Sequence, residues 1–353
     1  MKRLFSHQKR TFLALLLPVF LACFSPVFAQ HDEHVTGQEV AEEEKLKVGD
    51  VILEHVKDSH IWHFTQSVVI PLPVIVYTKE DGLKIFSSGN FFEHHHPVAY
   101  GDYTLEHEHI LYKGQPVLDL SITKNVAMLF INAALMLLIF IAAARGYAKR
   151  RGLAPKGIQS FMEPVILYVK DEIVKPNIGP TYTKYLPYLL TLFFFIFLGN
   201  LLGLLPGAAN LTGNIAVTAC LALLTFIIVN VNGNGTYWGH IFWTPGVPHW
   251  LRIIILPVEV IGVFTKPFSL TVRLFVAITA GHIVILALTA LTFLFKNWFV
   301  GIGTSLVNIF ISLIELLVAA IQAYVFTMFT SLYIGQAVEE HGAHDEHEHD
   351  TLV

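Results

Sequence analysis

The sequence predicts an all-α polytopic membrane protein with about five membrane helices. The last two helices are expected to be long and steeply tilted as an antiparallel hairpin, and a small β-containing segment precedes the membrane part. Of the 353 residues, 54% are hydrophobic and only 14% are charged, whereas about a quarter of a soluble protein is charged. Polar and ionic residues gather in residues 30–120 and after residue 338. The net charge of −4 gives no reason to expect a nucleic-acid partner.

Residues 1–29 are typical of a secretory signal peptide. The basic stretch "MKRLFSHQKR" precedes the apolar "TFLALLLPVFLACF", and "SPVFAQ" offers a cleavage site after Ala29. The alternative is an uncleaved first transmembrane helix. Cleavage would leave Cys220 as the only cysteine, so no disulfide is expected.

Residues 30–120 are predicted to form an extracytoplasmic, histidine-rich segment. The run "WHFTQSVVIPLPVIVYTKEDGLKIFSS" resembles a β-hairpin, because β-branched residues flank an Asp81–Gly82 turn signal. Histidines are frequent here and again in the tail at 339–353, which is predicted to be cytoplasmic. Metal binding is one interpretation of these histidines. A solvated polar segment is the favoured one, since no ligand spacing repeats.

Residues 121–338 are predicted to form the membrane domain, with spans near 125–145, 185–205, 212–232, 250–296 and 299–335. Five basic residues in "RGYAKRRGLAPK" follow the first span and mark its cytoplasmic end. The next segment, "SFMEPVILYVKDEIVKPNIGP", is too polar to cross and is expected to lie along the cytoplasmic surface. Five passes from an outside start leave the C-terminus inside.

The apolar run from Trp250 to Lys296 is too long for a simple crossing. As one helix it would extend about 70 Å, against a hydrocarbon core of about 30 Å. No turn signal divides it, so it is expected to tilt steeply or to bend, with Pro267 as the likeliest kink. A second long run follows after "KNW".

Polar residues recur every seven positions in both long runs. The first series is Arg252, Glu259, Lys266 and Arg273, and the second is Asn308, Glu315 and Gln322. A seven-residue step drifts by only about 20° around a helix, so each series lies near one face. In a membrane such a face points to a protein partner or to water. Interhelical hydrogen bonding is the alternative, and it suits Asn308 and Gln322 better than Arg273 or Glu315.

Facing residues of an antiparallel hairpin have residue numbers with a constant sum. Arg273 with Gln322 gives 595, and His282 with Glu315 gives 597, so both pairs place the turn near residues 297–298. His282 is nine residues past Arg273 and therefore points to about the opposite side of the helix. A kinked or wrapped helix is needed if both residues are to take part in the same site. An arginine keeps its charge, whereas a histidine and a carboxylate can relay protons.

These residues also carry a family resemblance. "PVEVIGVFTKPFSLTVRLFVAITAGH" followed by "IELLVAAIQAYVFTMFTSLYI" resembles subunit a of the F-type ATP synthase, as do "DEIVKPNIGP", "KYLPYLLTLFFFIFLGNLLGLLPG" and "IPLPVIVYT". The resemblance implies that Arg273 is the essential arginine and Gln322 its neighbour. It also implies that Gly281, His282 and Glu315 occupy half-channel positions. The family commonly has "RLFGN" where this chain has "RLFVA", so Ala277 replaces an asparagine.

The resemblance further implies a proton-translocating stator subunit that is not an enzyme on its own. Its expected partners are a ring of c subunits, peripheral-stalk b subunits, the rest of the ATP synthase and the lipid bilayer of the bacterial inner membrane. Arg273 would be the counter-charge to the ring carboxylates. Glu259 and Asn308, as members of the two seven-residue polar series, are also expected to join the proton path. No cofactor and no bound metal are implied. Two alternatives are a divalent-metal transporter with histidine-rich sensing segments and a passive membrane anchor.

Overall fold

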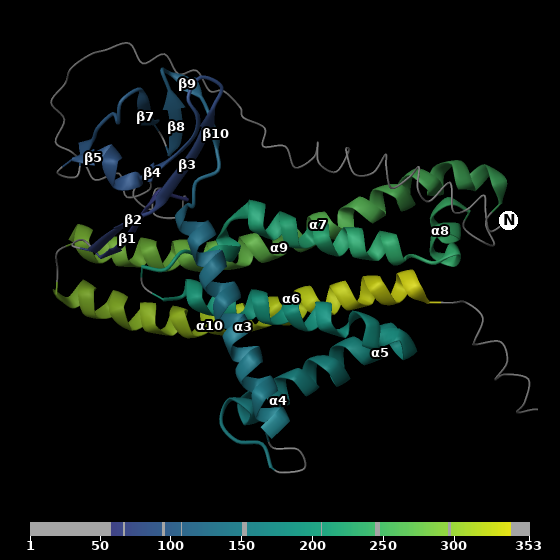
Figure 1. The fold of residues 1–353 in the computed structure, drawn as a ribbon. Coiled ribbons are helices and arrows are strands. Elements are labelled where there is room, and N and C mark those ends of the chain that lie inside the picture. The colour runs from purple at the N-terminus through teal and green to yellow at the C-terminus, as the bar shows by residue number, and fades with distance from the viewer. Residues whose placement is uncertain are drawn as a thin grey trace, which may run out of the picture.

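The computed structural model describes residues 58–65, 68–93, 96–106, 108–149, 154–205, 207–243, 248–295 and 298–339. A small β-domain precedes a bundle of helices (Figure 1). The predicted signal peptide and the tail beyond residue 339 lie outside the described residues. Cleavage after Ala29 and the role of the tail therefore stay predictions.

The β-domain consists of short antiparallel strands. They are β1 (Ile61–Thr65), β2 (Val68–Pro71), β3 (Pro73–Thr78), β4 (Gly82–Ser87), β5 (Phe92–Glu93), β6 (His96–Pro97), β7 (Tyr103–Glu106), β8 (His109–Tyr112), β9 (Gln115–Pro116) and β10 (Leu118–Asp119), with a 3₁₀ turn η1 (Ser88–Phe91). Two three-stranded sheets have the orders β10-β3-β4 and β7-β8-β9, and β1-β2 and β5-β6 form separate pairs.

The hairpin predicted at Asp81–Gly82 is present as β3 and β4. Their register closes with Thr78 opposite Gly82, and Gly82 has a φ of 72°, which a glycine adopts without strain. Alternate residues of β3 face inward, so Val74 and Val76 are fully buried. They pack with Phe91, Tyr103, Ile110 and Tyr112 in the core of this domain.

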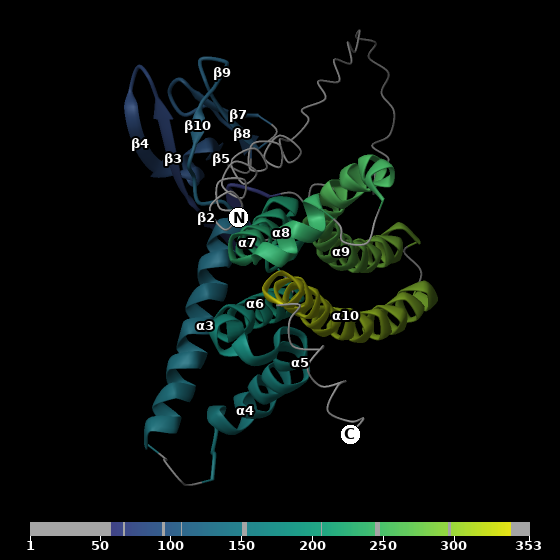
Figure 2. The same ribbon diagram turned by 90° about the vertical axis from the view of Figure 1, so that its right-hand side faces the viewer.

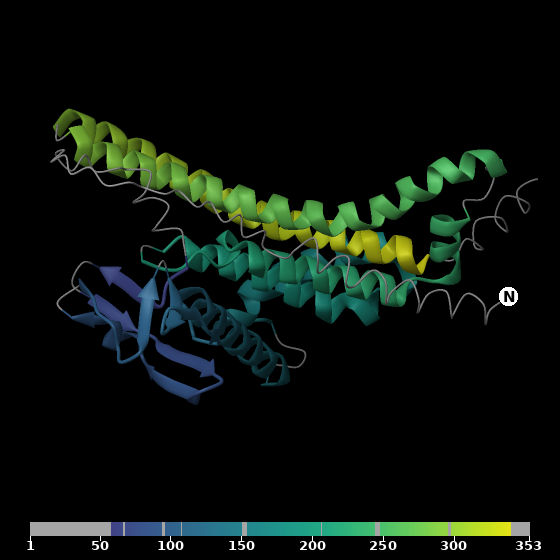
Figure 3. The ribbon, with the colours of Figure 1, turned by 90° about the horizontal axis from the view of Figure 1, so that it is seen from above.

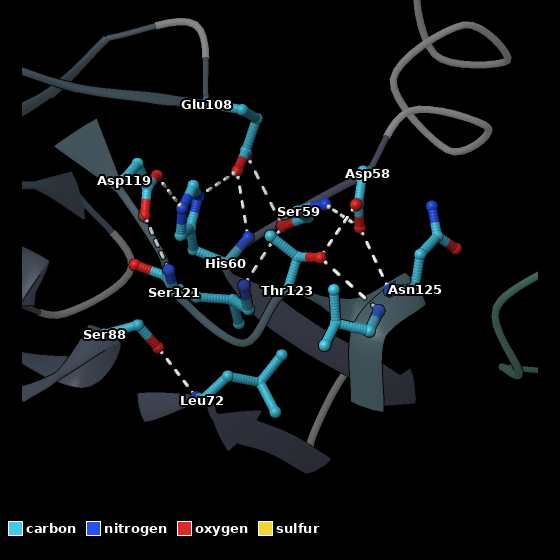
Figure 4. Close-up of polar contacts among 12 residues, drawn as sticks. Asp58, Ser59, His60, Leu72, Ser88, Glu108, Asp119, Ser121, Thr123 and Asn125 are labelled. Atoms are coloured by element: carbon cyan, nitrogen blue, oxygen red, sulfur yellow. Dashed lines mark hydrogen bonds and ion pairs between the residues drawn. The ribbon is translucent and has the colours of Figure 1, made fainter. Parts of the chain in front are cut away.

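A buried histidine joins three parts of the β-domain (Figure 4). The Nε2 atom of His60 lies 2.9 Å from Asp119 Oδ2 and its Nδ1 atom lies 3.4 Å from Glu108 Oε2. Ionised carboxylates only accept hydrogen bonds, so both contacts require a doubly protonated ring. Burial disfavours that charge, but the hydrogen bonds and charges of Asp119 and Glu108 outweigh it and raise the pKa of His60 to about 9.

The stability of the β-domain should therefore decrease at alkaline pH. The pKa of His60 is raised from 6.5 to about 9 in the folded chain, so its stabilisation is complete below pH 6.5 and is lost as the pH rises through about 9. Hydrogen exchange at residues 59–61, corrected for intrinsic rates, should show weaker protection at pH 9 than at pH 6.5. In His60→Gln, which has no proton to lose, this difference should be much smaller. Equal pH dependence in the two proteins would contradict the assignment.

The β-domain is hydrogen-bonded directly to the first long helix. The carboxylate of Asp58 accepts a hydrogen bond from Thr123 Oγ1 at 2.8 Å and another from the backbone N–H of Asn125 at 3.1 Å. A carboxylate is stabilising at a helix N-terminus. The start of that helix is therefore fixed to the residues just before β1.

The rest of the described chain is almost entirely helical. Its elements are α3 (Lys124–Lys149), α4 (Ile158–Tyr168), a π-helix η2 (Val169–Val174), α5 (Lys175–Ile178), η3 (Gly179–Thr181), α6 (Tyr182–Gly203), η4 (Leu211–Gly213), α7 (Ile215–Asn232), α8 (Gly235–Phe242), α9 (His249–Phe295) and α10 (Trp298–Val338). Five helices of the described part are long and apolar enough to cross a membrane: 124–149, 158–203, 215–232, 250–292 and 298–338. The chain is thus mostly helical with five candidate membrane helices, as the sequence predicts.

The segment predicted to lie along the membrane surface forms α4, η2 and α5. It turns back at Gly179, which has a φ of 72°, and α5 packs against the C-terminal part of α10. The Nδ2 atom of Asn177 donates to Ser331 Oγ at 3.0 Å. Gly335 is buried at the same contact, and a Cβ atom there would lie only 1.9 Å from the carbonyl oxygen of Asn177.

The two long helices α9 and α10 form a hairpin that runs at a steep angle to α3 (Figures 1 and 2). α9 stays helical through Pro257 and Pro267, and it is visibly curved when seen from above (Figure 3). Pro267 has no N–H to donate to the carbonyl of Val263, one turn earlier. Its own carbonyl accepts a hydrogen bond from Thr271 Oγ1 at 3.0 Å. α9 is therefore curved but remains one continuous helix across both prolines.

The hairpin is buried unevenly along its length. Near the turn both helices project beyond α6 and α7 (Figure 3), and the only buried residues of α10 before Ala319 are Thr304 and Glu315. From Ala319 onward, buried residues recur in every turn. One anchor is Asn200 of α6, whose Nδ2 atom donates to the carbonyl of Ala319 at 3.2 Å.

Candidate functional site

Polar contacts between α9 and α10 define the register of the hairpin. Thr292 Oγ1 lies 2.6 Å from Thr304 Oγ1, and Asn308 Nδ2 donates to Thr289 Oγ1 at 3.0 Å. The residue numbers of these two pairs add up to 596 and 597. The sums of 595 and 597 expected from the sequence agree with this register, so the antiparallel pairing is confirmed.

Glu315 is the buried carboxylate of this site. It is 3% exposed, and neither carboxylate oxygen has a hydrogen-bond partner among the described residues. The carboxylate lies against Gly281 of α9, where a Cβ atom would be 3.2 Å from Glu315 Oε1. Gly281 thus provides the space that the carboxylate occupies.

The direct pairing of His282 with Glu315 is not formed in the structure. The half-buried His282 follows Gly281, and no hydrogen bond joins its ring to the carboxylate. The reason is helical geometry, since consecutive residues point about 100° apart. The hairpin sums identify the correct turn of α9, but Gly281 is the residue that faces Glu315.

Arg273 lies midway along α9 and is half-buried. Its guanidinium carbon is 4.5 Å from the centroid of the Phe329 ring of α10. Among the described residues, no carboxylate lies within ion-pair distance of this guanidinium. The charge is therefore held by an aromatic face and has no anionic partner in this part of the chain.

Side-chain direction explains why Arg273 reaches Phe329 rather than Gln322, which the residue sums place opposite. Side chains of a helix lean toward its N-terminus. On α9 this direction leads toward the C-terminal end of the antiparallel α10. A long arginine side chain therefore contacts a residue of higher number than the one directly opposite. Gln322, seven residues before Phe329 on α10, is half-buried.

A cavity lined by both polar and apolar side chains lies beyond Arg273, toward the C-terminal end of α10. Its volume is about 260 Å³. Polar side chains of α8, α9, α10 and the residue after α10 line it: Tyr237, His240, Glu259, Lys266, Gln336 and Glu339. The ammonium group of Lys266 donates to Gln336 Oε1 at 3.2 Å and lies 5.0 Å from the centroid of the Tyr333 ring.

Sequence reasoning missed the roles of Phe329 and Gln336. Both continue the seven-residue series of Asn308, Glu315 and Gln322, so extending that series would have located them. The polar series predicted from the sequence ends at Gln322, because the next member, Phe329, is aromatic and interrupts the polar pattern. Arg252 stands apart from the site, because its guanidinium carbon lies 3.9 Å from the centroid of the Trp243 ring.

The arrangement separates two polar regions along one hairpin. The Glu315 region lies toward the turn, the Glu259 and Lys266 cavity lies toward the far end, and Arg273 stands between them. Along α9, Arg273 is eight residues from Gly281 and seven from Lys266, or about 12 and 10 Å. A proton could approach the middle of the hairpin from either end, but a fixed positive charge opposes its passage between the two.

Comparisons with known proteins give consistent matches. The family model described as ATP synthase A chain matches residues 126–335, and a domain of unknown function (DUF8433) matches residues 51–127. ATP synthase subunit a 2 of Chlorobaculum tepidum is 40% identical over 330 residues, covering 91% of this chain and 81% of the relative. ATP synthase subunit a of Pelodictyon phaeoclathratiforme is 37% identical over 381 residues, covering 99% and 98%. The subunit a of Chloroherpeton thalassium is 44% identical over 235 residues, covering 65% and 69%.

Proposed function

The chain belongs to the ATP synthase A chain family, and from this premise we propose that it is the proton-translocating stator subunit of an F-type ATP synthase. It would act in a bacterial inner membrane beside a rotating ring of c subunits, with peripheral-stalk b subunits and the rest of the complex as further partners. The observation that carries the proposal is the position of Arg273. It is half-buried between two polar regions, and its charge has no carboxylate partner among the described residues.

In this proposal Arg273 is the counter-charge for one carboxylate of each ring subunit. A carboxyl group that faces lipid is neutral because desolvation penalises its charge, and the same group beside an arginine is ionised. The ring therefore carries protons through lipid and releases them at Arg273. Each charge that crosses the membrane potential is worth about 2.3 kcal/mol per 100 mV, which supplies the work of rotation.

The region around Glu315 is proposed as one half-channel. Glu315, Asn308, His282 and Gln322 would conduct protons between one side of the membrane and the ring. A buried carboxyl group without a hydrogen-bond partner is typical of a proton-exchanging site. The glycine at 281 keeps the carboxyl group in contact with α9.

The cavity lined by Glu259 and Lys266 is proposed as the second half-channel. It lies at the opposite end of the hairpin and is large enough for several water molecules, at about 260 Å³ against about 30 Å³ per water. Arg273 lies between the two half-channels and prevents a direct leak, because an excess proton is repelled by its charge.

The proposed orientation places the β-domain outside the cytoplasmic membrane and the C-terminus inside. Basic residues such as Arg145 and Lys149 at the end of α3 mark the cytoplasmic side. α9 and α10 are long for a crossing and run at a steep angle to α3 (Figure 1). With α3 along the membrane normal, the hairpin is steeply tilted in the membrane.

His282 directly follows the glycine that faces Glu315, so we expect the two titratable residues to act as one proton-relay unit although their side chains are not hydrogen-bonded to each other. The alanine variants His282→Ala and Glu315→Ala should each impair proton conduction, and the double variant should lose less than the sum, by about 1 kcal/mol or more. The exchange His282→Glu with Glu315→His should restore part of the activity, because the relay needs both groups but not their order. The measurements are passive proton conductance and ATP synthesis in vesicles that contain the whole complex.

Ser312→Ala, at an exposed position of the same helix, is the matched control and should conduct normally. Strict additivity without rescue by the exchange would show that the two residues serve independent sites. Normal conduction in Glu315→Ala would contradict the proposed half-channel itself.

A further inference from the structure

Two cations of α9 lie over two neighbouring aromatic rings of α10. The guanidinium carbon of Arg273 is 4.5 Å from the Phe329 ring centroid, and the ammonium of Lys266 is 5.0 Å from the Tyr333 ring centroid. The two rings are one helical turn apart, with centroids separated by 6.0 Å. Phe329 is itself half-buried in the interface between the two helices. The rings form a short aromatic strip along the part of α10 that faces these cations.

An aromatic ring holds a cation differently from a carboxylate. The negative face of the ring attracts the charge without neutralising it. The five N–H donors of a guanidinium all point outward in its plane. A ring over the guanidinium therefore leaves those donors available to a carboxylate that arrives from outside the chain. A carboxylate of this chain at the same place would compete with the incoming one.

The two cations of α9 are held at separate aromatic rings, Arg273 at Phe329 and Lys266 at Tyr333. Lys266 is engaged by Gln336 and by the Tyr333 ring, so the two positive charges have separate binding places along the strip. Like charges repel over the short distances involved. Separate rings keep Arg273 toward the middle of the hairpin and Lys266 toward the cavity.

We infer that Phe329 is a positioning residue for Arg273. Its phenyl group holds the guanidinium in place during the interval between the passage of one c-subunit carboxylate and the next, and it does so without reducing the charge of the guanidinium. This inference rests on the proposed function, since it gives the held arginine its task. The inference adds to the proposed function a residue, Phe329, that has no titratable group and takes no direct part in proton transfer. Loss of the aromatic face should let the guanidinium move and should loosen the coupling between proton flow and rotation.

The test replaces Phe329 by phenylalanines with one, two and three ring fluorines. Fluorination keeps the shape nearly constant while it weakens the negative face of the ring. ATP-driven pumping and passive proton leak are measured in vesicles with the whole complex. Leak should rise and pumping should fall stepwise along the series, by on the order of tenfold at three fluorines. Phe329→Trp should retain coupling, and Phe329→Leu should lose it.

Phe326, which is buried on the same helix, is the matched control, and its fluorinated forms should behave like the unmodified chain. A flat series at Phe329 would overturn the inference even if Phe329→Leu fails to assemble, because the fluorinated chains keep the packing. Arg273→Ala is measured in vesicles of the same kind, so that failure of the proposed function can be told apart from failure of the positioning role. If it still pumps, the proposed function fails. If it does not pump and the Phe329 series is flat, only the positioning role fails.

Discussion

Arg273→Ala and Arg273→Gln should abolish ATP synthesis and coupled proton pumping while the chain still inserts and assembles. Both variants remove the fixed charge that, in the proposed mechanism, ionises each passing carboxylate and blocks a direct leak between the two half-channels. Insertion should not suffer, because an arginine in a membrane helix is itself costly, at about 3 kcal/mol on insertion scales. Arg273→Lys should recover little, since a lysine loses its proton more readily when buried and lacks the planar fork of donors. The measurement is ATP synthesis driven by an imposed proton gradient.

Arg252→Gln provides the matched control on the same helix. Arg252 shares the seven-residue series, but its guanidinium lies over Trp243 at the start of α9, away from the middle of the hairpin. Synthesis should change by less than about threefold in this variant. Near-normal synthesis in Arg273→Ala vesicles would refute the central role of the arginine.

Gly335→Ala should strongly destabilise the packing of α10, and Gly335→Val should prevent stable accumulation of the chain. The Cβ atom of an alanine would lie 1.9 Å from the carbonyl oxygen of Asn177. That oxygen belongs to backbone and cannot rotate away, so α5 and α10 would have to separate. Overpacking of a close contact typically costs about 1–3 kcal/mol, and here the Asn177–Ser331 hydrogen bond at 3.0 Å would be lost as well. Thermal unfolding in detergent and the yield of assembled complex report the effect.

Gly303→Ala is the control in the same helix. A Cβ atom at Gly303 meets nothing within 4 Å, and alanine is the better helix former by about 1 kcal/mol. This variant should be neutral or slightly stabilising. Similar behaviour of Gly303→Ala and Gly335→Ala would show that the close contact does not limit stability.

Much of the helical architecture follows from sequence patterns. Long apolar runs predict helices of membrane length, and the seven-residue polar series predicts which faces of α9 and α10 meet. The residue sums place the turn near residues 297–298, in agreement with the observed contact of Thr292 with Thr304. These inferences succeed because helical periodicity is local and because an antiparallel hairpin has a single register variable.

The finer contacts depend on side-chain direction and on long-range packing, which periodicity does not encode. Arg273 contacts Phe329 because its long side chain leans along the helix, and the residue sums treat side chains as points. His60 meets Asp119 and Glu108 only after several short strands have folded together. Likewise, nothing near Gly335 in the sequence indicates that the backbone of Asn177 will pack against it.

The uneven burial of the hairpin has a mechanical consequence. A hairpin that is embedded in the bundle over one half of α10 and projects beyond it over the other is a cantilever with its root in the protein. A load applied sideways deflects the free end of a cantilever most and its root least. Arg273 is seated on Phe329, in the well-buried half of α10, whereas Glu315 lies where burial is sparse. Under the proposed function, the hairpin would yield toward its turn under the torque of the rotating ring, while Arg273, the proposed counter-charge of each ring carboxylate, would stay close to the rigid root.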